Sequence, residues 1–119
     1  MVLADTSVWI SHLHRPDPRL GELLNGRQIA CHPLILGELA CGSIGRRDEI
    51  LTLLRHLPGP RIASHEEVLE FIERKRLWGV GLSYIDVHLL ASALLSNIQL
   101  WTVDKHLRAA AQALGVAYG

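Results

Sequence analysis

The chain has 119 residues, 49% of them hydrophobic, and its twelve Lys and Arg balance twelve Asp and Glu. One domain over residues 1–119 accounts for this length, and the apolar content excludes a disordered chain. No apolar run approaches the roughly 18 uninterrupted residues of a membrane span, and the N-terminus lacks the cationic start of a signal peptide. We therefore expect a soluble, cytoplasmic protein that does not enter a membrane.

The first half of the chain predicts two short strands and four helices. Apolar residues recur there at helical spacing, Pro33 suits the first turn of a helix, and Gly42 suits its C-terminal cap. Breaks are expected at residues 15–18, at Asn25 and Gly26, and at residues 58–60. The predicted elements are a strand at 2–4, helices through 8–13 and 20–24, a strand at 28–31, and helices at 33–41 and 46–56.

The second half predicts three helices among short strands. Ser64 with Glu67, and Ser83 with Asp86, have the spacing of capping boxes that open helices. The first of these helices should bury Val68, Leu69, Phe71, Ile72 and Leu77 and end at Gly79 and Gly81. Further expectations are a minor strand at 61–63, a helix from 83 to 97, a strand at 98–103, a helix at 105–114 and a short strand at 116–118. Alternating strands and helices predict an α/β fold around a mostly parallel sheet.

Four acidic residues lie where a soluble surface does not explain them. Asp5 and Asp104 each follow an apolar strand directly, and open α/β sheets gather ligand sites at the carboxyl ends of their strands. Asp86 lies among Leu89, Leu90 and Ala93 on one helix face, so it should point inward, whereas His88 and Ser92 should point away.

Glu38, the fourth, is flanked by Leu34, Ile35 and Cys41 on a stripe expected to pack toward the sheet. Burying several carboxylates without a partner is costly, so these four need a compensating positive charge. A shared Mg²⁺ or Mn²⁺ ion would supply it, because hard cations prefer oxygen ligands.

Structural explanations also exist for each acid. Asp5 and Asp104 could cap helices, Asp86 could belong only to its capping box, and Glu38 could pair with a buried Arg. Other chemistries have less support. The histidines and cysteines show no zinc spacing, and Ser7 lies in no nucleophile motif. Cys31 and Cys41 are expected to be buried thiols without a disulfide.

Four short motifs at these acids resemble those of PIN-domain ribonucleases, and in particular the VapC-type toxins of VapBC toxin–antitoxin pairs. The match spans nearly the whole chain and keeps the motifs in the family's order. They are Asp5-Thr6-Ser7 for D-[ST]-[SN], Glu38 with Leu39 and Gly42 for E-L-x-x-G, Asp86 with Ala91 for D-x-x-x-x-A, and Thr102-x-Asp104 for T-x-D.

The resemblance implies a three-layer α/β/α fold and a metal-dependent ribonuclease. Asp5, Glu38, Asp86 and Asp104 would be the catalytic carboxylates around one or two Mg²⁺ or Mn²⁺ ions, with Glu38 a ligand through water or the group that orients the attacking water. A second set, made of Thr6, Ser7 and Thr102, would hold these acids by hydrogen bonds. The implied partners are RNA, a VapB-type antitoxin and a second copy in a homodimer.

RNA binding fits the charge once the four acids are set aside, because eight acids then face twelve Lys and Arg. Two alternatives remain open. One is a PIN-like RNA- or protein-binding module without catalysis, and the other, less favoured, is a receiver-like signalling domain. Trp9, in the helix that follows Asp5, could lie in an exposed apolar groove that binds an antitoxin tail, or it could be ordinary core.

Overall fold

The protein is described here by a computed structural model that covers residues 1–119. Its centre is a three-stranded parallel sheet in the order β2-β1-β3, in which β1 spans Val2–Ala4, β2 spans Ile29–Ala30 and β3 spans Gln99–Trp101. In the register, Val2 lies beside Ile29 on one side and Gln99 on the other. The central strand is fully buried, so the residue that follows it, Asp5, emerges in the middle of the sheet's carboxyl edge.

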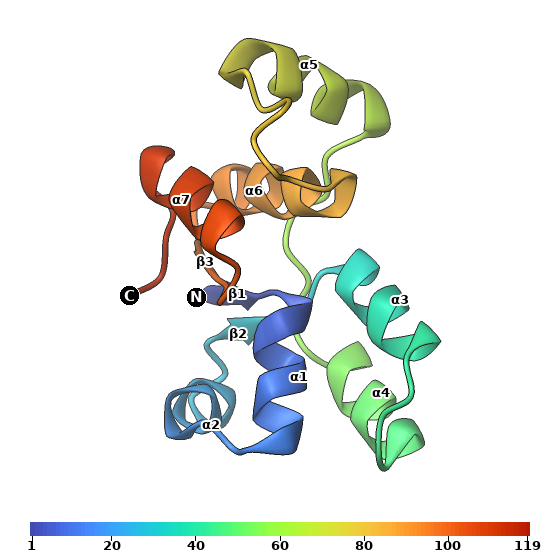
Figure 1. The fold of residues 1–119 in the computed structure, drawn as a ribbon. Helices are drawn as coiled ribbons and strands as arrows, with labels where there is room; N and C mark the ends of the chain where they lie inside the picture. The colour runs from blue at the N-terminus through green and yellow to red at the C-terminus, as the bar shows by residue number, and fades with distance from the viewer.

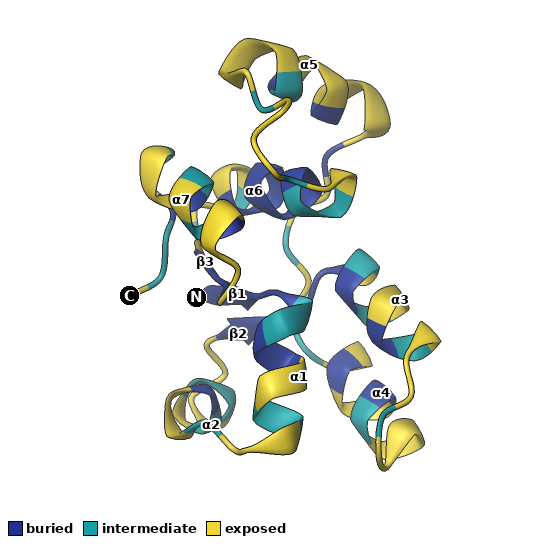
Figure 2. Ribbon diagram, in the orientation of Figure 1, coloured by how far each residue is buried: buried dark blue, intermediate teal, exposed yellow.

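Seven helices cover this small sheet. They are α1 (Thr6–His14), α2 (Pro18–Asn25), α3 (Pro33–Cys41), α4 (Arg47–Arg55), α5 (His65–Lys75), α6 (Tyr84–Ser96) and α7 (Lys105–Ala113). Helices α6 and α7 lie on one side of the sheet with α5 outside them, and α1 to α4 lie on the other (Figure 1). The buried apolar residues form a single core between these layers (Figure 2). None of the helices has the length and hydrophobicity to cross a bilayer.

Two predicted strands are wrong or reduced. Residues 61–63 form no strand, because the Arg61 N–H donates to Ser96 Oγ at 2.8 Å instead of to a neighbouring strand. Residues 116–118 make only an isolated bridge between Leu100 and Ala117. That bridge is built from two backbone hydrogen bonds, in which Leu100 donates to Val116 and Tyr118 donates to Leu100.

Three predictions about helices and thiols need correction. Helix α5 ends at Lys75, because Arg76 takes a left-handed conformation with φ of 54° and stops the helix before Gly79. Leu69, expected inside, is exposed on this helix. Both cysteines are free thiols, but only Cys31 is buried and Cys41 is exposed, since Cys41 is the last residue of α3.

Trp9 is core. Its side chain is 2% exposed, so the prediction that it lies in an open groove is wrong and its role as ordinary core is confirmed. Helix α1 contacts α3, and Trp9 lies on the half of α1 nearest the sheet, where burial is greatest. The apolar residue of α1 that reaches the surface is the next one, Ile10.

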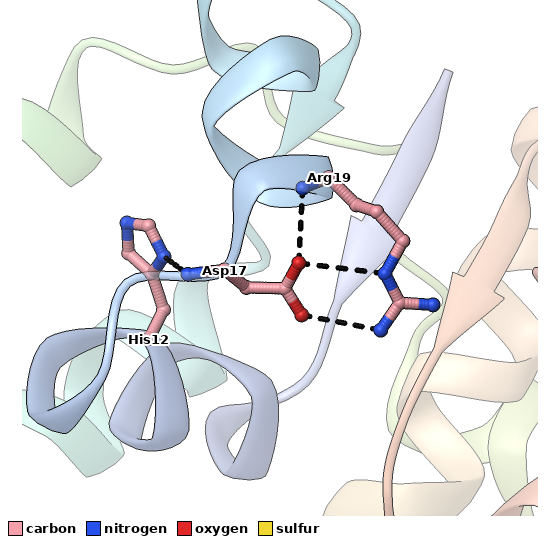
Figure 3. A network of polar contacts seen from close by, with 3 residues as sticks. All are labelled: His12, Asp17 and Arg19. Atoms are coloured by element: carbon pink, nitrogen blue, oxygen red, sulfur yellow. Dashed lines mark hydrogen bonds and ion pairs between the residues drawn. The ribbon is translucent and has the colours of Figure 1, made fainter.

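The proline-rich break between α1 and α2 is held by a polar network (Figure 3). His12 Nδ1 accepts from the Asp17 N–H at 2.9 Å, and Asp17 caps α2 by accepting from the Arg19 N–H at 2.9 Å. The Arg19 guanidinium pairs with the same carboxylate at 3.1 Å and lies over the Trp101 ring, 4.7 Å from its centroid. The Arg19 hydrogen bond lowers the pKa of Asp17. This turn therefore ties α1 and α2 to the end of β3.

Candidate active site

Asp5 is the buried centre of the predicted site. Its side chain is 6% exposed at the end of β1, and it also caps α1. One oxygen, Oδ1, accepts from the Val8 N–H at 3.2 Å and from the Ser7 hydroxyl. The other, Oδ2, accepts from Thr102 Oγ1 at 2.6 Å. Two donors from the first turn of α1 and one from the residue after β3 therefore fix the orientation of this carboxylate.

The surroundings of Asp5 disfavour the charged form of its carboxyl group. Burial raises the pKa of the Asp5 carboxyl above its ordinary value, although hydrogen bonds from Ser7, Thr102 and Val8 pull in the opposite direction. The negative charge of Asp86 contributes to the same increase. A buried carboxylate with a raised pKa beside a second carboxylate is typical of a functional site, because a bound cation would stabilise both charges.

Asp104 is connected to Asp5 through Thr102. The Thr102 hydroxyl, which donates to Asp5, also accepts from the Asp104 N–H at 3.0 Å. Asp104 caps α7 with one oxygen, Oδ1, which accepts from the N–H groups of His106 and Leu107 at 2.9 Å each. Its other oxygen, Oδ2, accepts no hydrogen bond and the residue is exposed, so this oxygen is free to bind a ligand.

Asp86 is half-buried in the predicted capping box. Its Oδ2 accepts from the Ser83 N–H at 2.9 Å, and Ser83 Oγ accepts from the Asp86 N–H at 3.1 Å. The second oxygen, Oδ1, accepts nothing from the protein. Capping therefore occurs at Asp5, Asp86 and Asp104 alike, and at Asp86 and Asp104 it leaves one oxygen of each carboxylate free. Capping and ligand binding are compatible in this arrangement.

Glu38 is exposed, which corrects the expectation that it packs toward the sheet. The core-facing positions of α3 are Ile35 and Leu39, and Glu38 lies one position off that stripe, a rotation of roughly 100° around the helix. Its Oε1 accepts from Thr6 Oγ1 at 2.7 Å. Glu38 thus reaches the beginning of α1 from the surface, and Thr6 joins it to the chain segment that carries Asp5.

The four acids have no cation of their own. None of them forms an ion pair with Lys or Arg, so the pairing of Glu38 with a buried Arg does not occur. In this conformation no group of three or more His, Cys, Asp or Glu side chains is arranged to hold a metal ion. The available donors are nonetheless carboxylate and hydroxyl oxygens, which suit Mg²⁺ or Mn²⁺ and not a soft metal.

A histidine cluster beside Asp86 was missed by the sequence reasoning. His88 and Ser92, expected to point away from the core, are 7% and 0% exposed. All residues from Val87 to Ala93 are buried, because α6 contacts both β3 and α5 and has no solvent face along this stretch. His32, which follows β2 and caps α3, is buried against His88, with ring centroids 5.9 Å apart. Its position after a strand and before Pro33 is the signal that would have revealed it.

The cluster is joined through one tyrosine. Tyr84 Oη lies 2.6 Å from His65 Nδ1 and 3.1 Å from His88 Nε2. The opposite nitrogen of each inner ring, His32 Nε2 and His88 Nδ1, has no partner, nor has Ser92 Oγ. Burial, aided by the neighbouring His88, lowers the pKa of His32 to about 4, and burial also lowers the pKa of His88. The His32 imidazole is therefore neutral at pH 7, and burial favours the neutral form of His88 as well.

Known proteins identify the family. The model of the PIN domain family matches residues 2–113, and the chain belongs to this family. Two curated relatives, both named Ribonuclease VapC32, come from the CDC 1551 / Oshkosh and ATCC 25618 / H37Rv strains of Mycobacterium tuberculosis. Each is 51% identical to this chain over 118 residues, which are 98% of this chain and 95% of the relative. The resemblance to VapC-type PIN ribonucleases is thereby confirmed.

A solved structure supports the fold. The crystal structure of PAE2754 from Pyrobaculum aerophilum matches with a TM-score of 0.58 and 18% identity, covering 91% of this chain and 77% of that chain. At this identity the likeness shows the fold alone. Together with the family match, it confirms the predicted three-layer α/β/α architecture.

Proposed function

We propose that this protein is a divalent-metal-dependent ribonuclease that acts as the toxin of a type II toxin–antitoxin pair. The observation that carries the proposal is the set of four acids around the carboxyl edge of the sheet, none of which has a protein cation. The relatives named Ribonuclease VapC32 support the same activity across nearly the whole chain. The substrate would be cytoplasmic RNA.

Asp5, Asp86 and Asp104 would hold the ion, with Glu38 beside it. The free oxygens of Asp86 and Asp104 and the buried charge of Asp5 fit a hard cation. When bound, Mg²⁺ or Mn²⁺ would acidify a water and neutralise charge on the phosphate oxygens. Thr102 and Ser7 would keep Asp5 in place as the substrate enters.

Glu38 is the best-placed group to orient the attacking water. Thr6 holds its Oε1 and leaves Oε2 free to accept a proton from that water. The water oxygen would bond to phosphorus as the bond to the 3′ oxygen breaks, and the departing 3′ oxygen would take a proton from solvent. The products would be a 5′-phosphate and a 3′-hydroxyl.

A cleavage assay tests this proposal. Purified protein and end-labelled RNA are incubated in EDTA, then with Mg²⁺ or Mn²⁺ restored, and the new ends are sequenced. Metal-dependent cleavage with 5′-phosphate ends is expected. Cleavage at full rate in EDTA would reject the metal, and absence of cleavage with either ion would favour the second candidate, a PIN-like binding module. One observation favours that candidate: in this conformation no three His, Cys, Asp or Glu side chains are arranged to hold a metal ion.

The antitoxin would bind a groove next to Glu38. A hollow of about 590 Å³ lies between α1, α3 and α4, and its lining includes Ile10, Leu13, Ile44 and Ile50 together with Glu38. An apolar antitoxin tail would fill it, and a basic side chain at its end would reach the carboxylates. By family resemblance, the toxin would also pair with itself as a homodimer.

Ile10, which is 40% exposed, replaces Trp9 as the residue that tests this groove. Ile10→Ser should weaken binding of the protein encoded by a short neighbouring reading frame by about tenfold, because one buried aliphatic contact is worth roughly 1.5 kcal/mol. Ile62→Ser, at a similarly exposed residue outside the groove, is the matched control. Equal affinity of the two variants would reject this groove.

A further inference from the structure

The loop between α5 and α6 packs against the first turn of α7. Gly81 has φ of +82°, and a Cβ built on it would lie 2.8 Å from Cγ and Cδ2 of His106. The backbone of the loop therefore rests directly on the His106 ring, in a conformation and at a distance that only glycine permits. Loop and helix enclose a hollow of about 420 Å³, lined in part by Arg76, Val80, Lys105 and His106.

Each wall of this hollow is continuous in sequence with residues of the candidate active site. On the α7 side, Lys105 follows Asp104 directly. On the loop side, the chain runs from Gly81 into the capping box of Ser83 and Asp86. If one phosphate of an extended RNA strand lies at these acids, the nucleotides next to that phosphate would lie beside the hollow.

The charge of the hollow suits a polyanion. Neither Arg76 nor Lys105 forms an ion pair, and no acidic residue lines the hollow. The groove between α1, α3 and α4 differs, because Glu38 lies in its lining. Unpaired cations in a concave surface attract phosphates and release bound counterions when they bind them.

An exposed indole completes the surface. In the sequence, Trp78 stands between Leu77 and Val80, which both line the hollow, and its side chain is 57% exposed. The other two tryptophans, Trp9 and Trp101, are buried, with exposed fractions of 2% and 3%. Trp78 thus contributes little to the core, whereas an exposed aromatic ring beside cations is the usual platform on which a nucleic-acid base stacks.

We propose that this surface, made of Trp78, Arg76 and Lys105, binds single-stranded RNA next to the scissile phosphate, with one base stacked on Trp78. The inference rests on the proposed ribonuclease function and extends it to the path of the substrate. Trp78 is a positioning residue, since it acts on the strand that flanks the reacting atoms. Arg76 and Lys105 contact the backbone phosphates on the same strand.

Fluorescence anisotropy with a short, unstructured, fluorescein-labelled RNA tests this surface. The measurement is made in EDTA, which removes the divalent ion, so that the RNA is bound but not cleaved. Trp78→Ala and Trp78→Leu should weaken binding roughly 5- to 150-fold, and Trp78→Phe should retain most of it, because stacking on an aromatic face is worth about 1–3 kcal/mol per base. Arg76→Gln with Lys105→Gln should reduce the slope of log affinity against log salt by about 1.4, or 0.7 for each lost phosphate contact.

Controls come from α4. Leu53→Ala removes a similarly exposed apolar side chain, and Arg55→Gln removes an exposed cation, both outside the hollow. RNA affinity should change by less than about twofold in each. Thermal melting of every variant checks that Trp78 substitutions leave the fold intact, and Trp78→Leu carries the test if Trp78→Ala unfolds.

RNA affinity of Trp78→Ala and Trp78→Leu within about twofold of wild type would overturn the proposal. If the same variants also lost binding of the antitoxin or of a second copy, the surface would be a protein interface. Failure of the ribonuclease function gives a different result, in which wild-type protein binds RNA in a Trp78-dependent way but cuts none with Mg²⁺ or Mn²⁺.

Discussion

Two clusters of buried polar residues lie near the carboxyl edge of the sheet, and they differ in how their atoms are satisfied. Around Asp5, both carboxylate oxygens accept hydrogen bonds, and Thr102 both donates and accepts. Around His88, three buried polar atoms have no partner, on His32, His88 and Ser92. Both clusters lie close to Asp86, which affects Asp5 through its charge and precedes His88 by two residues.

The difference separates two uses of buried polarity. Hydrogen bonds at Asp5 hold a charged group in one orientation despite the cost of burying it, which is what binding or catalysis requires. In the histidine cluster, burial favours the neutral forms of His32 and His88, and each polar atom left unsatisfied lowers stability. The Asp5 cluster should therefore control activity, and the histidine cluster should control stability and its dependence on pH.

The largest expected effect is on activity. Asp5→Asn keeps an oxygen that can cap α1 but removes the charge, so ribonuclease activity should fall by about two to four orders of magnitude. Asp17→Asn is the matched control, because Asp17 also caps a helix but lies outside the site. Cleavage rates measured with Mg²⁺ decide the comparison. Equal rates for the two variants would remove Asp5 from the catalytic machinery.

The sequence predicted most of the Asp5 cluster for clear reasons. Asp5 and Asp104 follow strands, and the end of a strand can be read from the chain alone. The capping box of Ser83 and Asp86 also formed as predicted. The exposure of Glu38 was missed because a helix with apolar residues on several sides does not define which of them faces the core.

The burial of His88 and Ser92 in the histidine cluster could not be predicted by the same logic. Amphipathic reasoning assigns each helix one buried face and one solvent face, but α6 is buried along seven consecutive residues. One side of α6 packs on the sheet, and its outer side is covered by α5, which precedes it in the sequence (Figure 1). Only the tertiary arrangement reveals that His88 and Ser92 are enclosed.

The next effect concerns acid stability. Because the pKa of His32 falls from 6.5 to about 4 in the fold, the unfolded chain binds the proton first as the pH drops. Stability from this residue is complete above pH 6.5 and is lost as the pH falls toward 4, by roughly 3 kcal/mol in total. His32→Asn keeps an N-cap acceptor for Leu34 but cannot be protonated, so its unfolding free energy should fall less over this range.

Urea unfolding at several pH values measures this effect. Asp5 works in the opposite direction, since a raised carboxyl pKa favours the fold as the pH falls, so the difference between wild type and His32→Asn isolates the histidine. The lowered pKa of His88 adds to the loss in both proteins. Parallel curves for the two proteins between pH 6.5 and 4 would contradict the buried neutral state of His32.

A pair of hydroxyl deletions compares the clusters directly. Thr102→Val removes a hydroxyl that joins Asp5 to the Asp104 backbone, so it should destabilise the protein by about 1–3 kcal/mol. Ser92→Ala removes a hydroxyl without a partner at a fully buried helix position, so it should leave stability unchanged or raise it by up to about 1 kcal/mol. Calorimetry in EDTA gives both values. A large loss in Ser92→Ala would mean that its hydroxyl has a partner, such as a buried water.

The smallest effect tests how Asp86 divides its carboxylate between cap and site. Asp86→Asn removes its repulsion of Asp5 but weakens the favourable charge at the beginning of α6, and these two changes are of similar size, about 0.3–1 kcal/mol each. In EDTA the melting temperature should therefore stay the same or rise slightly.

The increase in melting temperature caused by Mg²⁺ should shrink in the variant, because the free Oδ1 would no longer belong to a charged ligand. A clear fall in the EDTA melting temperature with an intact Mg²⁺ increase would assign Asp86 to the cap alone, and the metal site would then depend on Asp5, Asp104 and Glu38.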